Sequence, residues 1–308
     1  MVVPGGTPIV DVLGGWPLNE LVPLVQRAAS KGKPIAFIGT GSEPLRNDAS
    51  KRLVADVLAP NVCAWSVRSD EDRDRLTGYG VDPGAITTAA DLAWDLSPAT
   101  SQFGQSYLRS LGVDGSSRLV GVNVNIEHFV RKAQPQLLEI LAQYLDVLVE
   151  RYCAHILFLC NEVRDGETFD LAASREVRNA MRHPQGSSIV PNEYWLPQQM
   201  MSLIACCDMT VSTRYHFCLF SALQGVPFVA VQRSSKVTDL CSDLAWGGGV
   251  AMADMSLDYL VALTERLQAD RTRLEAQLGA SVRRMRQRCE RNVVALKALM
   301  ERVRENQS

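Results

Sequence analysis

One histidine and three cations stand where two apolar stretches of the chain end. They are Arg214, His216, Arg233 and Lys236. The first two follow residues 209–212 and the last two follow residues 227–231, which we expect to be buried parallel strands with their carboxyl ends at one sheet edge. The helices that begin there, the first capped by Ser212 or Thr213, would add N–H groups and positive dipole ends. The pattern indicates a site for a phosphate or a carboxylate.

His216 is the candidate for proton transfer at this edge. Histidine exchanges a proton near neutral pH, which suits a general acid or base. We expect Arg214 and His216 in the first turn of one helix and Lys236 at the start of the next. Arg214 would either join the anion site or brace the helix. The alternative for His216 and Lys236 is a solvated position at the start of a helix.

Two further polar residues follow apolar stretches in the same way. Arg68 comes directly after residues 62–67, and Asn161 comes directly after residues 155–160. Arg68 could bind an anion, or it could only pair with the acidic residues 70–72. The Gly-Thr-Gly at residues 39–41 would suit a backbone that approaches a ligand, although any tight turn between a strand and a helix can use glycine.

Short apolar runs alternate with amphipathic segments along most of the chain. The expected strands cover residues 34–39, 62–67, 119–124, 155–160, 209–212 and 227–231. The expected helices cover residues 18–31, 46–59, 70–78, 135–151, 170–182, 195–207, 214–224, 236–245 and 256–304. This alternation predicts an α/β protein with parallel sheets covered by helices.

The length and composition fit a globular protein of two lobes. The 308 residues are 46% hydrophobic and 21% charged, and chains of this size tend to divide into two cores. We expect an N-terminal lobe over residues 1–112 and a second lobe over residues 113–255. Residues 256–308 would form a closing helix that packs back across the lobes.

Charge and cysteine content exclude several classes of protein. The net charge of −2 leaves no general basic field for a nucleic acid. None of the eight cysteines forms a pair with metal-ligand spacing, so we expect buried reduced thiols and no metal site. No stretch has the pattern of a membrane span or of a signal peptide. We therefore expect a cytoplasmic protein, with work at the inner face of the membrane as an alternative.

An ordered series of short motifs resembles the polysaccharide pyruvyl transferase family. The main signature is the Arg-x-His of Arg214 and His216, followed by Gly-Val-Pro at residues 225–227 and then by Lys236. Weaker matches precede it in the family's order, at residues 2–6, 39–45, 66–68, 80–81 and 90–91. Together the motifs span residues 2–245, and the spacing from the Arg-x-His to Lys236 is their most specific part.

The resemblance implies two Rossmann-like lobes of the glycosyltransferase-B type, with a site that needs no metal or cofactor. It implies a bacterial enzyme that transfers pyruvate from phosphoenolpyruvate to two sugar hydroxyls, forming a cyclic ketal on a cell-surface or exported polysaccharide. Arg68, His216 and Lys236 match positions of the family's donor pocket. We expect His216 to move protons while Lys236 and Arg68 bind phosphate and carboxylate. Asn161 would touch the acceptor, which is a sugar or a lipid-linked glycan.

The sequence departs from the family pattern in two places. Ser69 stands where the family has aspartate. The family also begins with a strand and a Gly-Asp loop before the element that resembles residues 2–6, so we expect a truncated N-terminal lobe. A start codon placed too far downstream, a diverged subfamily or a loss of catalysis would each explain it. The alternative functions are a nucleotide-sugar-dependent glycosyltransferase of the same architecture and a non-catalytic truncated member of the family.

Overall fold

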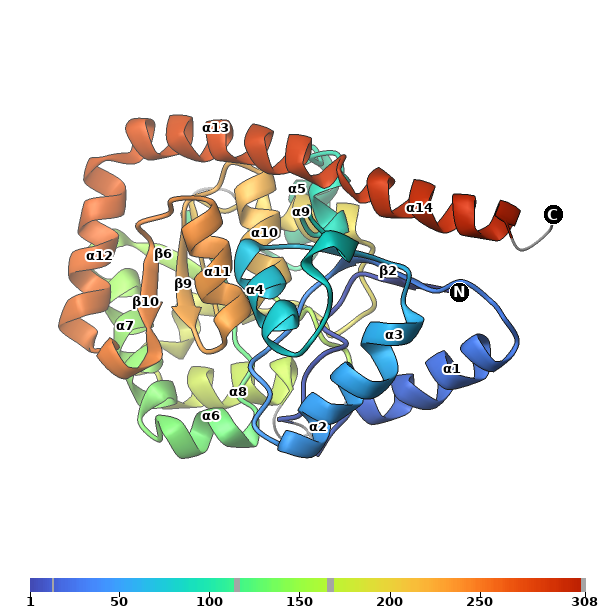
Figure 1. Cartoon of the computed structure of the whole chain (residues 1–308). Helices are drawn as coiled ribbons and strands as arrows, with labels where there is room; N and C mark the ends of the chain where they lie inside the picture. The colour runs from blue at the N-terminus through green and yellow to red at the C-terminus, as the bar shows by residue number, and fades with distance from the viewer. Residues whose placement is uncertain (13, 114–116, 165–168, 306–308) are drawn as a thin grey trace. The chain divides into compact units, whose positions relative to one another are not determined.

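A computed structural model describes residues 1–308 except 13, 114–116, 165–168 and 306–308 (Figure 1). The contacts divide the chain into two compact units. The first unit combines Met1–Leu96 with Arg283–Ser308, and the second unit is Ser97–Val282. The division into domains at residues 112 and 255, which the sequence suggests, stays a prediction.

The first unit contains a parallel sheet in the order β1-β2-β3-β4. Its strands are β1 (Val2–Pro4), β2 (Ala36–Thr40), β3 (Ala64–Val67) and β4 (Ile86–Thr88). The helices between them are α1 (Leu18–Ser30), α2 (Asp48–Leu53), α3 (Ala59–Asn61) and α4 (Asp70–Gly78), with a π turn over Val54–Leu58. Because the strands are parallel, their carboxyl ends share one edge, and Arg68 lies there directly after β3.

Different parts of the chain cover the two faces of this sheet. On one face Phe37 and Trp65 stack with ring centroids 4.4 Å apart, inside an apolar core that includes residues of α1. On the other face Ala36 and Ala64 pack with residues of α14 (Asn292–Glu305). Small side chains let a helix lie close to the strands, so the last helix of the chain completes the first unit.

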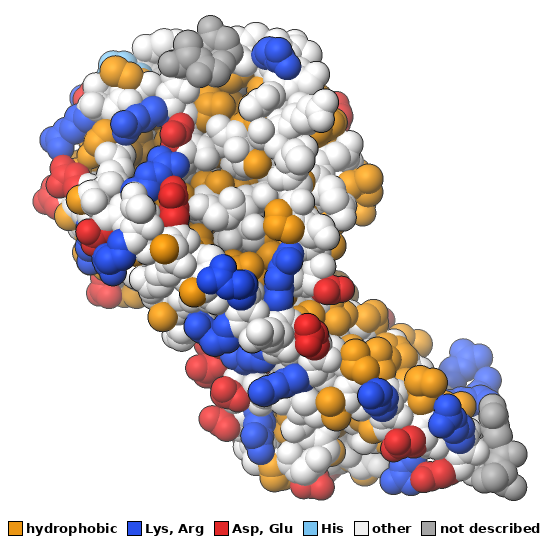
Figure 2. All heavy atoms as spheres, turned by 90° about the horizontal axis from the view of Figure 1, so that it is seen from above, with side chains coloured by type: hydrophobic (Ala, Val, Ile, Leu, Met, Phe, Trp, Pro, Cys, Tyr) orange, Lys and Arg blue, Asp and Glu red, His pale blue; other side chains and the backbone are white. Residues whose placement is uncertain are grey.

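α14 also keeps apolar side chains at the surface. They are Val293, Val294, Leu296, Met300 and Val303, each between 37% and 54% exposed. Figure 2 looks onto this helix from above, and hydrophobic side chains lie there among those of Lys and Arg. The exposed side of α14 is therefore mixed in character rather than purely polar.

The second unit contains a larger parallel sheet in the order β10-β9-β8-β5-β6-β7. Its strands are β5 (Arg118–Asn123), β6 (Ala154–Phe158), β7 (Ser187–Ile189), β8 (Met209–Ser212), β9 (Phe228–Gln232) and β10 (Gly249–Ala251). The chain builds outward from β5 to β7, then returns to the other side of β5 and builds outward to β10. Sheets of this order bind ligands outside the carboxyl ends of the strands where the direction reverses, here between β5 and β8.

Helices precede, connect and follow the strands of the second sheet. They are α5 (Gln102–Ser110), α6 (His128–Ala133), α7 (Leu137–Tyr152), α8 (Asp170–Ala180), α9 (Pro197–Ile204), α10 (Tyr215–Leu223), α11 (Ser235–Asp243), α12 (Leu257–Ala269) and α13 (Arg271–Cys289). The chain passes from the second unit to the first within α13. No helix in the described ranges has both the length and the apolar character that crossing a membrane requires.

The α/β fold with parallel sheets expected from the sequence is confirmed. All six expected strands are present, and β8 and α4 have the expected bounds. The expected closing helix is instead three helices, α12, α13 and α14. Strands β4, β7 and β10 were not expected, because three residues are too few to show a hydrophobic period.

Candidate functional site

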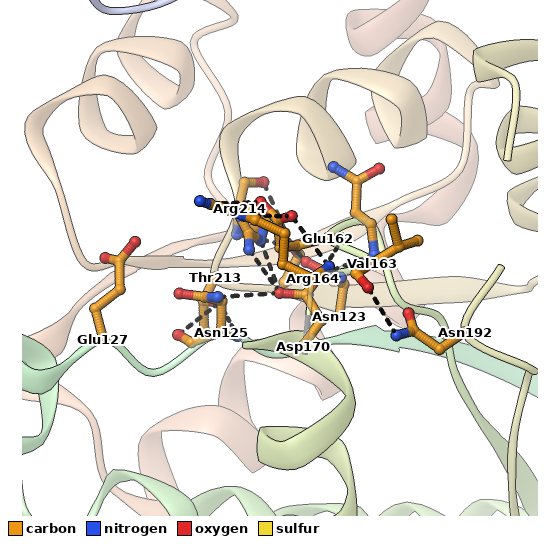
Figure 3. A network of polar contacts seen from close by, with 12 residues as sticks. Asn123, Asn125, Glu127, Glu162, Val163, Arg164, Asp170, Asn192, Thr213 and Arg214 are labelled. Atoms are coloured by element: carbon orange, nitrogen blue, oxygen red, sulfur yellow. Dashed lines mark hydrogen bonds and ion pairs between the residues drawn. The ribbon is translucent and has the colours of Figure 1, made fainter. Parts of the chain in front are cut away.

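A buried carboxylate organises the carboxyl edge of the second sheet at the point where the strand order reverses (Figure 3). Asp170 is the first residue of α8 and is 0% exposed. Its Oδ2 accepts hydrogen bonds from Asn123 Nδ2 at 2.9 Å, Asn161 N at 2.8 Å and Glu162 N at 3.0 Å. Its Oδ1 accepts from Asn125 Nδ2 at 3.1 Å and from Arg214 Nε and Nη2 at 2.9 and 2.7 Å. One carboxylate thus joins the ends of β5, β6 and β8.

Arg214 braces this edge in the structure. Its side chain is 18% exposed and its guanidinium makes a charge-assisted pair with Asp170. Arg214 occupies the N-cap position of α10, not the first turn where we expected it. Its charge is therefore largely compensated by a buried carboxylate, which fits the bracing role better than a role as a primary anion ligand.

The hydroxyl groups of Ser212 and Thr213 do not cap α10 in the way expected from the sequence. Ser212 Oγ accepts from Arg214 N at 2.9 Å, just before the helix begins. Thr213 Oγ1 accepts from Asn125 N at 2.9 Å and so ties β8 to β5. The N-cap residues Arg214 and Ser234 themselves provide no side-chain cap to α10 and α11, and Ser234 Oγ has no hydrogen-bond partner. Two helix N-termini thus follow the neighbouring strands β8 and β9.

His216 and Lys236 lie at these two N-termini. Each is the second residue of its helix, α10 or α11, and each is partly buried. The His216 ring meets Tyr215 edge-on, with centroids 5.1 Å apart, and lies 6.3 Å from the ring of Phe220. Because β8 and β9 are adjacent and parallel, the two helices begin at the same edge of the sheet. The fold therefore brings together a histidine and a lysine that are twenty positions apart in the sequence.

Arg233 is the third expected cation, and it also braces the edge. It is 9% exposed, and its Nε donates to Thr213 O at 2.8 Å. Its Nη1 pairs with the carboxylate of Glu127, the N-cap residue of α6. Arg233 thus joins the end of β9 to the turn after β8 and to the segment after β5.

Asn161 also lies at this edge. Its backbone N–H donates a hydrogen bond to Asp170, and the residue is exposed. The next residue, Glu162, binds Arg164 through Nε at 2.9 Å, and this bond holds the pKa of the Glu162 carboxyl below its usual value. Arg164 in turn lies over the ring of Phe169, 4.6 Å from its centroid. Polar contacts therefore hold residues 161–164, which follow β6 beside the reversal point.

Arg68 lies in the first unit and is held by acidic residues. Its guanidinium is 3.6 Å from Asp72 and 3.7 Å from Asp91, and its Nη2 donates to Thr7 Oγ1 at 3.2 Å. Only 4% of Arg68 is exposed. Pairing with the acidic stretch was the structural alternative, and the ion pair with Asp72 is present. A Cβ on Gly41 would lie 2.1 Å from the Arg68 guanidinium carbon, so this glycine makes room for the arginine.

The cysteines and the acidic residues form no metal site in the described part of the chain, where no group of three or more His, Cys, Asp or Glu could hold an ion. Burial raises the pKa of the Cys160 thiol to about 12, so this residue at the end of β6 is uncharged at neutral pH. Burial also raises the pKa of Cys241 to about 11. Cys153 is an exception to the expected burial, since it ends α7 in a left-handed conformation and is exposed.

The sequence patterns did not identify several residues of this edge, above all Asp170, Asn123 and Asn125. The signal for the two asparagines was present, because they alternate in a strand and its continuation that are otherwise apolar. Asp170 gave a weaker signal, as the first residue of an expected helix. Its partners are up to 47 residues away in the sequence, which no local pattern reveals.

Solved structures with a similar fold include several enzymes of UDP-sugars. HepE of Anabaena, in complex with UDP and glucose, is 12% identical, with a TM-score of 0.59 over 93% of this chain and 76% of that chain. The UDP-GlcNAc 2-epimerase of Methanocaldococcus jannaschii is 10% identical, with a TM-score of 0.57 over 86% and 68% of the two chains. A UDP-forming trehalose-phosphate synthase of Burkholderia xenovorans is 13% identical, with a TM-score of 0.59 over 91% and 71%. At these identities the likeness shows the fold alone, which is glycosyltransferase-B-like.

The family comparison is more specific than the structural one. No curated protein matches the chain. Residues 2–235, however, match the family model for polysaccharide pyruvyl transferase. The matched region includes β8, α10 and β9, and it ends at the first residue of α11. Since the match covers most of its length, the chain belongs to the polysaccharide pyruvyl transferase family.

Proposed function

We propose that the protein transfers pyruvate from phosphoenolpyruvate to two hydroxyls of a sugar, forming a cyclic ketal and releasing phosphate. The observation that carries the proposal is that two helix N-termini follow the adjacent parallel strands β8 and β9, with His216 and Lys236 in their first turns. In a chain of this family, that arrangement suits a small polyanion. The acceptor would be a sugar or a lipid-linked glycan in the bacterial cytoplasm.

The reaction gives His216 and Lys236 separate tasks. Phosphoenolpyruvate carries a phosphate and a carboxylate, so the N–H groups of α10 and α11 and the Lys236 ammonium would offset its charge. His216 would donate a proton to the methylene carbon, which becomes a methyl group, while a sugar hydroxyl attacks the adjacent carbon and loses its own proton. The bond from that carbon to the phosphate oxygen then breaks, and the phosphate leaves with the proton that the first hydroxyl lost. The second hydroxyl adds to the same carbon, closes the ketal and gives its proton to His216, which restores the histidine.

The other candidate residues would orient the site or bind the substrates in this proposal. Arg214 and Arg233 hold the turn after β8 through Asp170 and Glu127, so they orient the N-terminus of α10. Asn161 lies on the loop after β6 and would face the acceptor. Arg68 would contribute to binding of the donor, a role that stays a prediction because its guanidinium already has two acidic neighbours.

Calorimetry tests the donor without knowledge of the acceptor. Phosphoenolpyruvate is titrated into the wild-type protein, into His216→Ala and into Lys236→Ala, with His183→Ala and Lys132→Ala as controls elsewhere in the second unit. We expect binding that weakens in the first two variants and is unchanged in the controls. Tight binding of a UDP-sugar with none of phosphoenolpyruvate would favour a glycosyltransferase instead. No response to either ligand would favour a non-catalytic member of the family.

A further inference from the structure

Three aromatic side chains, from α5 and from the segment before α9, pack together, and a fourth, Tyr194, precedes one of them in the chain. The rings of Tyr107 and Trp195 meet edge-on with centroids 4.9 Å apart, and Phe103 lies 5.9 Å from each of them. Tyr194 is 79% exposed, Phe103 is 36% exposed and the neighbouring Leu196 is 53% exposed. We call these five residues the aromatic platform. Apolar side chains that are exposed together at a surface often mark a binding site, whereas single exposed apolar side chains are normal.

The platform stands on a rigid base. Gly104 of α5 lies so close to α9 that a Cβ there would be 2.3 Å from Ser202 O, and Gly104 N donates to Ser202 Oγ at 2.9 Å. Edge-on contacts between the rings fix their orientations further. A ligand that settles on these rings would therefore cost little conformational entropy in the protein.

The platform belongs to the edge of the sheet that carries the candidate site. Residues 190–196 follow β7, so they leave the sheet at its carboxyl edge. Asn192 Nδ2 donates to Val163 O at 3.4 Å, which ties this segment to the loop after β6 (Figure 3). That loop begins at Asn161, whose N–H binds Asp170. The aromatic platform and the buried carboxylate are thus linked through one continuous set of contacts.

The chemistry of the platform suits a sugar ring. A pyranose has an apolar face of C–H groups, which packs on an aromatic ring, and a rim of hydroxyls, which needs polar partners. Glu193 supplies an exposed carboxylate next to Tyr194 and Trp195 in the chain, and it acts on Tyr107, whose pKa is raised by burial and by that negative charge. Phosphoenolpyruvate has no such apolar face, so the platform does not suit the donor.

We infer that the aromatic platform binds the acceptor glycan, with pyranose rings stacked on Trp195 and Tyr194. The inference rests on the proposed function for its choice of ligand, since a pyruvyl transferase must hold a saccharide beside its donor. The inference assigns acceptor binding to the segment before α9, whereas the residues after β8 and β9 bind the donor in the proposed function. A single stacked ring is worth about 0.5–1.5 kcal/mol, so loss of one ring should weaken binding roughly twofold to tenfold.

The test measures saccharide binding apart from donor binding. Cellotetraose, laminaritetraose and mannotetraose are titrated into the full chain by calorimetry, and phosphoenolpyruvate is titrated separately. The variants are Trp195→Ala and Tyr194→Ala, and the controls are Trp16→Ala and Tyr259→Ala, which remove exposed aromatic side chains elsewhere. Circular dichroism of each variant checks that the fold is kept.

We expect at least one tetrasaccharide to bind, with weaker binding in the Trp195 and Tyr194 variants and unchanged phosphoenolpyruvate binding. Saccharide binding that is equal in all proteins, or absent from the wild type, would overturn the inference. Self-association that Trp195→Ala abolishes, without an effect on saccharides, would overturn it in favour of a protein interface. If the wild type binds a tetrasaccharide but does not bind phosphoenolpyruvate, the proposed function is contradicted, whereas the assignment of the aromatic platform to saccharide binding is not.

Discussion

Replacing Asp170 by asparagine should loosen the carboxyl edge of the second sheet. Each carboxylate oxygen accepts three hydrogen bonds, so either orientation of the new amide turns an NH2 group toward three donors. Arg214, with 18% of its side chain exposed, would also lose its counter-charge. Breaking a buried ion pair costs about 3–5 kcal/mol, and partial access of water to Arg214 points to the lower end, about 3 kcal/mol.

Native-state hydrogen exchange is the suitable assay, because a chain of two units need not unfold in one step. Amides of β5, β6 and β8 should exchange roughly a hundredfold faster in Asp170→Asn, since about 1.4 kcal/mol corresponds to a factor of ten. Amides of β2 and β3 in the first unit should be unaffected. Asp146→Asn is the matched control: this buried carboxylate accepts hydrogen bonds from the backbone N–H groups of Arg182 and His183, and its ion pair with Arg182 is long, at 3.6 Å, and has an arginine side chain that is 67% exposed.

A double-mutant cycle with Arg214→Met isolates the ion pair. The single Arg214 variant leaves Asp170 with four amide donors, so it should cost less than Asp170→Asn. The coupling energy between the two substitutions should be about 1.5–3 kcal/mol. Exchange rates in Asp170→Asn that stay close to those of the wild type, with coupling below about 0.5 kcal/mol, would refute the role of Asp170 as the organiser of this edge.

Two other perturbations have defined outcomes. Gly41→Ala should destabilise the first unit by about 1–3 kcal/mol in chemical denaturation, because its Cβ would meet the Arg68 guanidinium, whereas Gly78→Ala, whose Cβ would meet nothing within 4 Å, should not. Glu162 has its pKa lowered in the folded protein by Arg164, so the pair contributes stability above the unfolded value of about 4.3 and loses it as pH falls through the lower folded value. Glu162→Gln should therefore lower the melting temperature slightly at pH 7 and lose that effect near pH 3; an equal effect at both values would contradict the pair's contribution.

Much of the fold could be predicted from local pattern. Residues 209–212 form a strand with the expected bounds, because a short run of apolar and β-branched residues favours a strand that is buried on both faces. The break between α13 and α14 had no such signal. Asn292, the first residue of α14, is 4% exposed, accepts from Ser66 Oγ at 2.7 Å and donates to Ala90 O at 3.0 Å. These partners are 226 and 202 residues away, so packing on the first sheet rather than helix propensity fixes that position.

The candidate site divides in the same way. His216 and Lys236 could be placed at one edge because each follows a recognisable strand in a parallel sheet. Bracing was one of the two roles that the sequence left open for Arg214, but its partner Asp170, and the pairing of Arg233 with Glu127, could not be foreseen, because these carboxylates reach the edge through α8 and through the segment after β5. Sequence patterns therefore located the edge, and only the tertiary contacts distinguished its bracing cations from the residues that we propose to bind the donor.

The most direct test of the account is to locate the phosphoenolpyruvate site by hydrogen exchange. The central claim is that the donor binds at the first turns of α10 and α11, which hold His216 and Lys236 and begin at the same edge of the sheet. Phosphoenolpyruvate should slow exchange in peptides that contain Tyr215 to Cys218 and Ser235 to Thr238, and Lys236→Ala should remove most of this protection. Protection elsewhere in the chain, or protection of these turns by UDP-sugars but not by phosphoenolpyruvate, would contradict it.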